Sequence, residues 1–185
     1  MRTKPSMAPV LALVALTAAC SSPPAPPPPD TRPLANVTAT PRECDLISTN
    51  AIKLATGLND YTAYGTKMDM GRRFASCSVH GEFGQESKAG LLIEVFDPSS
   101  NDAEDLDNTK LSTHGNDLPD NLGPGFAARR KNAQDQTIAV VYGWTPDYKR
   151  LLTISIIENA PGRDSLADAT EFFRQLKPLL LDKPQ

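Results

Sequence analysis

The sequence predicts a single α+β domain in which helices cover one face of an antiparallel sheet of about four to five strands. Segments that alternate apolar and polar residues, as strands do, occur in two pairs. Segments with apolar residues at helical spacing precede and follow these pairs, and a short polar helix separates them. The chain of 185 residues has room for one such domain, which we place at residues 44–182.

Residues 1–19 have the features of a secretory signal peptide. Arg2 and Lys4 precede an apolar run from Met7 to Ala19. This run is too short for a membrane-spanning helix, which needs about 20 apolar residues. We therefore expect the protein to be exported.

The end of this run, Thr17-Ala18-Ala19-Cys20, resembles the lipobox of bacterial lipoproteins. The resemblance implies that the sulfur of Cys20 receives diacylglycerol and that cleavage makes Cys20 the new N-terminus. Several acyl chains would hold the protein stably at a membrane, whereas one chain holds only marginally. The alternative is an ordinary secretory cleavage nearby, which leaves Cys20 free or removes it.

Residues 21–43 are rich in proline. Together with the lipidated Cys20 they form the linker that we assign to residues 20–43. Proline fixes φ and lacks an N–H donor, so we expect polyproline II or disordered chain there. Fully extended, these residues would reach roughly 70 Å. A spacer is one interpretation, and a proline-rich recognition ligand is the other.

The net charge argues against a nucleic-acid partner. Without residues 1–19 the chain keeps 17 basic residues against 22 acidic ones, so its formal charge changes from −3 to −5. An acidic protein lacks the general basic field that attracts nucleic acid or anionic headgroups.

Two cysteines, Cys44 and Cys77, remain in the domain. An exported protein lies where disulfides persist, so we expect these two to be bonded. They have no CxxC spacing, and His80 and His114 are far apart in the sequence without a zinc-like pattern. We expect neither a metal nor a cofactor.

The elements follow in order. Ser48 and Gly57 bound the first helix as its N-cap and its left-handed C-terminal residue, with Ile47 packed on Ile52. The remaining elements are predicted as strands at 74–83 and 91–96, an acidic helix at 102–111, a loop at 114–130, strands at 137–144 and 151–157, and an amphipathic helix at 164–181. Cys77 faces inward on its strand.

The order of these features resembles actinobacterial lipoproteins that carry the domain of unknown function 3558. They comprise the lipobox cysteine, the proline-rich linker, Cys-Asp-Leu-Ile-Ser at 44–48, Cys77 in the first strand, a Gly-x-Gly-x-Ala segment at 123–127 and the C-terminal helix. Val79 departs from the aromatic residue common two places after the second cysteine. The resemblance implies a cell-envelope location and no established activity, and it carries over only Cys20, Cys44 and Cys77.

Several side chains are candidate functional groups. His80 and His114 have two interpretations, as solvated histidines or as general bases. A general base also needs a nucleophile and an orienting partner. Arg129, Arg130 and Lys131 either meet an anionic envelope polymer or the acidic patch of a partner, or form the solvated start of the next strand. Four acidic residues suggest calcium but lack the EF-hand pattern, so a solvated helix face is the alternative: Asp102, Glu104, Asp105 and Asp107. Tyr142 and Trp144 share a strand face and are expected in the core.

The sequence contains no nucleophile elbow, zinc-protease helix or phosphate-binding loop, so no catalytic residue is predicted. We expect a non-enzymatic, lipid-anchored binding or accessory module on the outer face of the cell membrane. Its membrane contact is the lipid on Cys20, and its partner is an unidentified envelope protein, glycan or lipid. The alternative is a carrier or sensor that holds a small apolar ligand between sheet and helix; a hydrolase is a third interpretation.

Overall fold

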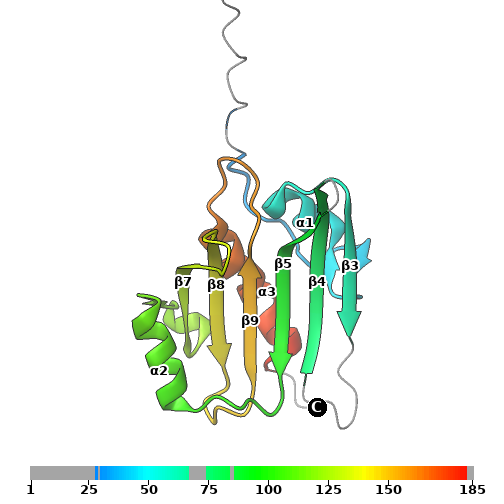
Figure 1. Cartoon of the computed structure of the whole chain (residues 1–185). Coiled ribbons are helices and arrows are strands. Elements are labelled where there is room, and N and C mark those ends of the chain that lie inside the picture. The colour runs from blue at the N-terminus through cyan, green and yellow to red at the C-terminus, as the bar shows by residue number, and fades with distance from the viewer. Residues whose placement is uncertain (1–27, 29, 67–73, 84–85, 183–185) are drawn as a thin grey trace, which may run out of the picture.

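The structure is a computed structural model that describes residues 28, 30–66, 74–83 and 86–182. The elements in chain order are β1 (Arg42–Glu43), β2 (Ile47–Ser48), α1 (Thr49–Thr56), β3 (Tyr61–Thr66), β4 (Phe74–Phe83), β5 (Glu86–Phe96), α2 (Ala103–Ser112), β6 (Asn116–Asp117), the 3-10 helix η1 (Asp120–Leu122), β7 (Gly125–Lys131), β8 (Thr137–Trp144), β9 (Leu151–Ile156) and α3 (Ser165–Leu180). Within the described residues the main sheet has seven antiparallel strands in the order β3-β4-β5-β9-β8-β7-β6 (Figure 1).

The α+β class and the antiparallel sheet are confirmed, but the expected four to five strands are too few. β3, β6 and β7 were not predicted, and most of β7 fell in the predicted loop at 114–130 because of its glycine and proline neighbours. Gly125 lies in a strand because β8 is very close: a Cβ on Gly125 would lie 2.4 Å from the carbonyl oxygen of Tyr142. The glycine therefore permits close strand packing rather than a turn.

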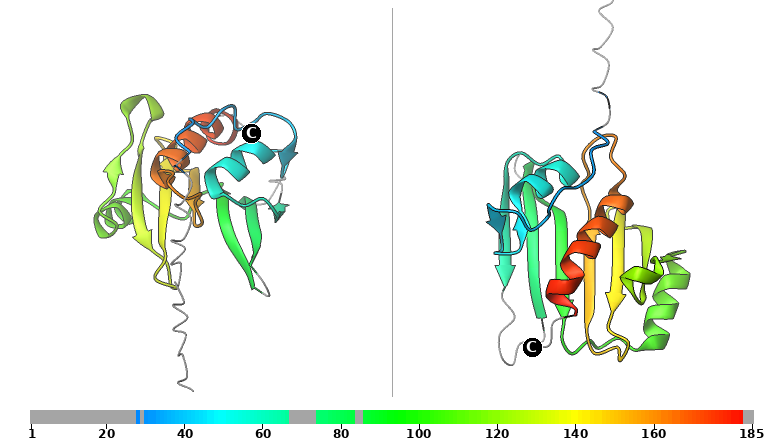
Figure 2. Two further views of the ribbon diagram at one scale, coloured as in Figure 1. Left: turned by 90° about the horizontal axis from the view of Figure 1, so that it is seen from above. Right: turned by 180° about the vertical axis from the view of Figure 1, so that it is seen from behind.

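Helices α1 and α3 cover one face of the sheet, as expected (Figure 2). The inner face of α3 is fully buried at Ala169, Phe172, Phe173 and Leu176. Phe173 packs on β8 where Gly143 has no side chain; a Cβ there would lie 2.1 Å from the phenylalanine ring. The space between α3 and β8 is therefore filled by protein atoms.

The opposite face of the sheet carries a second, smaller cluster at β7 and β8. Phe126 and Val140 are buried there, with Tyr142 and Trp144 half-buried beside them. Phe126 stacks on Tyr142 with ring centroids 4.7 Å apart. The expectation that both β8 aromatics pack in a core is met in this second cluster, and α2 lies at the same end of the sheet (Figure 1).

The helix ends follow the sequence signals with one difference. Gly57 takes the left-handed conformation at φ 75° and ends α1. Asp102 forms a capping box with Asp105 at the start of α2, and Asp164 accepts two N–H bonds at the start of α3. Ser48 occupies the N-cap of α1, but its side chain makes no capping bond; its own N–H donates to the carbonyl of Val37 at 2.6 Å.

Residues 30–43, which we call the strap, belong to the packed domain. They cross the helix layer between α1 and α3 and end in β1 (Figure 2). Leu34 is 5% exposed and Val37 is fully buried in the core. This differs from the predicted domain start at Cys44, because these two apolar side chains anchor a segment whose proline-rich composition indicated a free linker.

Candidate functional site

The strap is held by polar side chains at both ends of its path over α3. The Arg163 guanidinium donates to the carbonyls of Asp30 and Arg32 at 2.9 Å each. On α3 itself, the amide of Gln175 accepts the N–H of Val37 at 2.8 Å and donates to the carbonyl of Ala35 at 3.0 Å. The N-terminal segment therefore leaves the domain at a defined point, beside the start of α3.

The Arg163 side chain is itself fixed by Asp168 in the first turns of α3. Its guanidinium donates to both carboxylate oxygens, at 2.7 and 2.8 Å, and the two side chains are only 4% and 8% exposed. These hydrogen bonds raise the pKa of Arg163. Near the outer end of the strap, the Arg32 guanidinium hydrogen-bonds Asp30 and lowers the pKa of that exposed carboxyl to about 2.

The structure brings Cys44 and Cys77 together as predicted. Their sulfur atoms lie 2.07 Å apart and their Cα atoms 5.8 Å apart, within the range that a disulfide requires. Cys44 follows β1, and Cys77 faces the core from β4 with 2% exposure. The pair connects the segment that leads into α1 with the main sheet.

Cys20, the predicted lipid attachment residue, lies outside the described residues, as does the signal segment 1–19. Among the helices that the structure describes, none has the length and apolar character needed to cross a bilayer. Across residues 30–66, 74–83 and 86–182, no three His, Cys, Asp or Glu side chains gather as metal ligands would.

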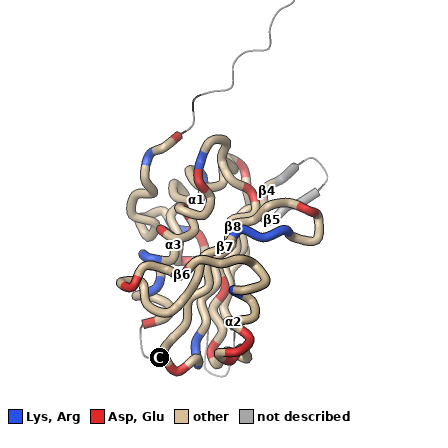
Figure 3. The backbone as a smooth tube through the Cα atoms, turned by 90° about the vertical axis from the view of Figure 1, so that its left-hand side faces the viewer, with Lys and Arg blue, Asp and Glu red and all other residues tan. Residues whose placement is uncertain are grey.

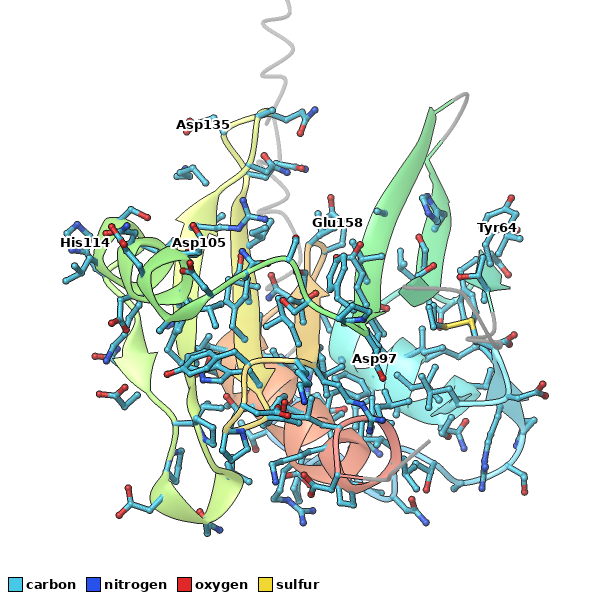
Figure 4. The ribbon with its side chains drawn as sticks, turned by 90° about the horizontal axis from the view of Figure 1, so that it is seen from below. Tyr64, Asp97, Asp105, His114, Asp135 and Glu158 are labelled. Carbon is cyan, nitrogen blue, oxygen red and sulfur yellow. A yellow bond between two sulfur atoms is a disulfide. The ribbon has the colours of Figure 1, made fainter. Side chains whose placement is uncertain are left out.

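The two histidines lie far apart. His114 belongs to the α2 end of the domain, whereas Tyr64, the ring neighbour of His80, lies at the opposite end of the sheet (Figure 4). Nε2 of His80 is hydrogen-bonded to the hydroxyl of Ser78, and the Tyr64 ring meets the imidazole edge-on at 5.6 Å. The three side chains form a polar patch on β3 and β4 that the sequence analysis did not identify, because Tyr64 lies in a strand it missed.

The charged clusters are parts of ordinary elements. Arg129, Arg130 and Lys131 are the exposed end of β7 itself, rather than the start of the next strand (Figure 3). The acidic residues of 102–107 form the N-terminal turns of α2, where Asp102 and Asp105 cap the helix. Negative charge at a helix N-terminus is favourable, which accounts for the acidic pattern without calcium.

A groove of about 420 Å³ lies between α3 and the β6–β7 end of the sheet. Its apolar surface comes from Leu118, Pro119, Ala127, Leu166 and Ala167. Leu118 and Ala127 are buried at its base. Segments from the middle and the end of the chain thus meet here, and the volume falls within the range of small-ligand and side-chain sites.

The carboxylates that line the groove each already hold a basic partner. Asp164 accepts from Arg129 at 2.5 Å, and Asp117 accepts from Lys110 at 2.5 Å. Glu171 pairs with Arg174 at 2.6 Å, and this guanidinium lowers the pKa of the Glu171 carboxyl. The rim is therefore polar and nearly balanced in charge around an apolar base.

Hydroxyl groups are few in the described lining of the groove. It includes one hydroxyl side chain, Thr170, whose Oγ1 donates to the carbonyl of Leu166 at 2.8 Å. The lining contains neither histidine, cysteine nor serine. Its charged groups are the carboxylates described above and the guanidinium of Arg174.

The groove was not predicted from the sequence. Its walls come from β6 and β7, which lie in the segment read as a loop, and from α3 about 40 residues later. Only the apolar residues Leu118 and Ala127 around the glycines offered a signal. The chain matches no family model, and no curated protein or solved structure is significantly similar to it.

Proposed function

We propose that the protein is a lipid-anchored, non-enzymatic binding module of the bacterial cell envelope, and that it binds a partner in the groove between α3 and β6–β7. The observation that carries the proposal is the apolar base of Leu118 and Ala127 inside a rim of ion-paired side chains. Such a surface accepts an apolar side chain of a partner, while the rim provides polar contacts around it.

The anchoring part of the proposal rests on the sequence. The lipobox-like Thr17-Ala18-Ala19-Cys20 and the resemblance to lipoproteins with the domain of unknown function 3558 support an extracytoplasmic location at the cell membrane. The strap adds a limit: with residues 30–43 packed on the domain, only about ten residues separate Cys20 from Asp30. At about 3.1 Å per residue they span at most about 30 Å, less than half the reach of a linker that runs to Glu43.

The alternative, a carrier of a small apolar ligand, needs space between sheet and helix. Phe172, Phe173 and Leu176 fill the inner side of α3 without exposed surface, and Phe173 occupies the position above Gly143. Dense packing at this interface favours binding on the outside of the domain over a ligand held inside it.

A photo-crosslinking side chain at Ala167 tests the groove in intact cells. Ala167 is exposed and lines the groove, and Leu111, 71% exposed on α2 and outside the groove lining, provides the matched position. We expect an adduct specific to position 167, whose mass identifies a protein, glycan or lipid partner. Identical adducts at both positions would show that the groove is not the binding site.

The anchor is tested separately with Cys20→Ser. This variant lacks the sulfur that carries diacylglycerol, so we expect it to leave the detergent phase and lose an acyl label while its fold is unchanged. A variant that still partitions and labels like the parent protein would contradict the lipoprotein assignment.

A further inference from the structure

We propose that β3 pairs antiparallel with β3 of a second copy, so that two sheets join at this edge. β3 is the terminal strand of the seven-stranded order and pairs with β4 alone among the described strands. An edge strand presents unpaired backbone N–H and C=O groups, which natural proteins protect unless the edge is used. The sequence of β3, YTAYGT, contains no charged residue and no proline.

The other edge of the sheet is protected. β6 has only two residues and pairs with Phe126 and Ala127, so the cations Arg129, Arg130 and Lys131 extend past it on β7 (Figure 3). Self-pairing of that edge around Arg130 would place like charges opposite one another, which is destabilising. Pairing of β3 with itself brings no charges of its own together, so the charge pattern selects β3 as the edge for a second copy.

The surroundings of β3 leave room for another strand. Four of its six residues are exposed, and the Tyr64 side chain, 60% exposed, lies at the outer end of the sheet (Figure 4). On the helix side, β3 contacts the segment around β1: the Tyr61 hydroxyl donates to Glu43 at 3.2 Å, and Gly65 lies against Cys44. These contacts lie on one face of β3, and β1 pairs with β2 in a separate sheet rather than with the edge of β3.

The symmetry of this pairing fixes where the two anchors leave the dimer, a point that rests on the anchoring proposed above. Antiparallel pairing of identical strands in one sheet places the two-fold axis perpendicular to the sheet. Both helix layers then lie on the same side, and with them both straps, because Gln175 of α3 holds Ala35 and Val37 in that layer. The loop from β9 to α3, where Arg163 holds Asp30, lies at one end of the strands (Figure 1), so the two anchors leave from opposite ends of the joined sheet.

The pairing also brings two polar patches together. Tyr64, Ser78 and His80 lie on β3 and β4 on the face opposite the helices, next to the two-fold axis. In the dimer the second copy contributes the same three side chains across the axis. The result is one continuous surface of two tyrosines, two serines and two histidines that neither copy has alone.

Photo-crosslinking at position 64 of the full-length protein tests the pairing in intact cells. Two differently tagged copies are expressed together, and position 111 on α2 is the matched control. We expect a product of twice the protein mass that contains both tags at position 64 and not at position 111. The absence of that product, or adducts at position 64 with other proteins only, overturns the proposal.

Charged substitutions on β3 provide the second measurement. Thr62→Lys and Thr66→Glu each bring two like charges onto the joined edge, one from each copy, so we expect each to reduce the crosslinked dimer by up to about fivefold, while Leu111→Lys leaves it unchanged. Thermal melting verifies that each variant is folded. Detergent partitioning of the protein without these substitutions separates the two proposals: if it partitions but gives no crosslinked dimer, the pairing alone is overturned, whereas protein in the aqueous phase overturns the anchor.

Discussion

The guanidinium of Arg163 lies 2.7 Å from the carboxylate of Asp168, and both side chains are almost fully buried. The same guanidinium holds the carbonyls of Asp30 and Arg32, so one ion pair fixes the position from which the strap leaves the domain. Sequence separation between Arg163 and Asp30 is 133 residues, which makes this contact a link between the two ends of the folded chain.

Asp168→Asn should be strongly destabilising. It removes the carboxylate partner of a buried guanidinium, and breaking a buried ion pair from one side costs about 3 to 5 kcal/mol of unfolding free energy. Urea unfolding measures this difference. Glu171→Gln, which breaks an exposed pair on the same helix, is the control and should cost about 1 kcal/mol or less. Equal losses in the two variants would contradict the role of Arg163.

The strap should contribute to stability through Val37. This side chain is fully buried, so Val37→Ala is expected to lower the unfolding free energy by about 2 kcal/mol. Thr31→Ala, at an exposed position of the same segment, should have little effect. A Val37 variant as stable as the parent would show that residues 30–43 form a free linker after all.

The Cys44–Cys77 pair should resist alkylation in the native protein. In a Cys20→Ser background we expect no added mass before reduction and two labels after it. Loss of a cross-link across 33 residues should lower stability by about 3 to 4 kcal/mol, since the unfolded chain gains freedom. The double Cys44→Ser, Cys77→Ser variant is the control, because a reductant should not change its stability further. Two reactive thiols in freshly isolated protein would contradict the bond.

Tyr61 should ionise at a higher pH in the folded protein than in the unfolded chain. Burial is the main cause, the Glu43 carboxylate adds to it, and together they raise the pKa of Tyr61 to about 12 from 10.0. Between these values the unfolded chain ionises while the folded one keeps its proton, so the free energy of unfolding falls as the pH rises from about 10 to about 12.

Ultraviolet titration of tyrosinate in the folded protein measures this delay. Tyr61→Phe should remove the late transition. Glu43→Gln should move it to lower pH but not to 10.0, because burial remains. A titration in which Tyr61→Phe removes no transition above pH 10.0 would contradict the environment of Tyr61.

The groove shows why the site could not be found in the sequence. Its base on β7 and its wall on α3 belong to segments about 40 residues apart, and neither carries a motif. The glycines around β7 indicate a loop by local rules, yet Gly125 serves the close contact with Tyr142 on β8. Such contacts depend on which strands become neighbours, which short-range patterns do not encode.

Local patterns by themselves determined the three helices, four of the seven main-sheet strands within the described residues, and the cysteine pair. These features depend on capping residues, on periodicity and on cysteine number, which act over a few residues or follow from composition. Only the tertiary structure decided that the proline-rich strap is part of the domain, since Leu34 and Val37 are anchored by burial against helices far along the chain. It also decided which strand forms the uncharged edge, because an edge is defined by the absence of a neighbour and not by the residues of the strand itself.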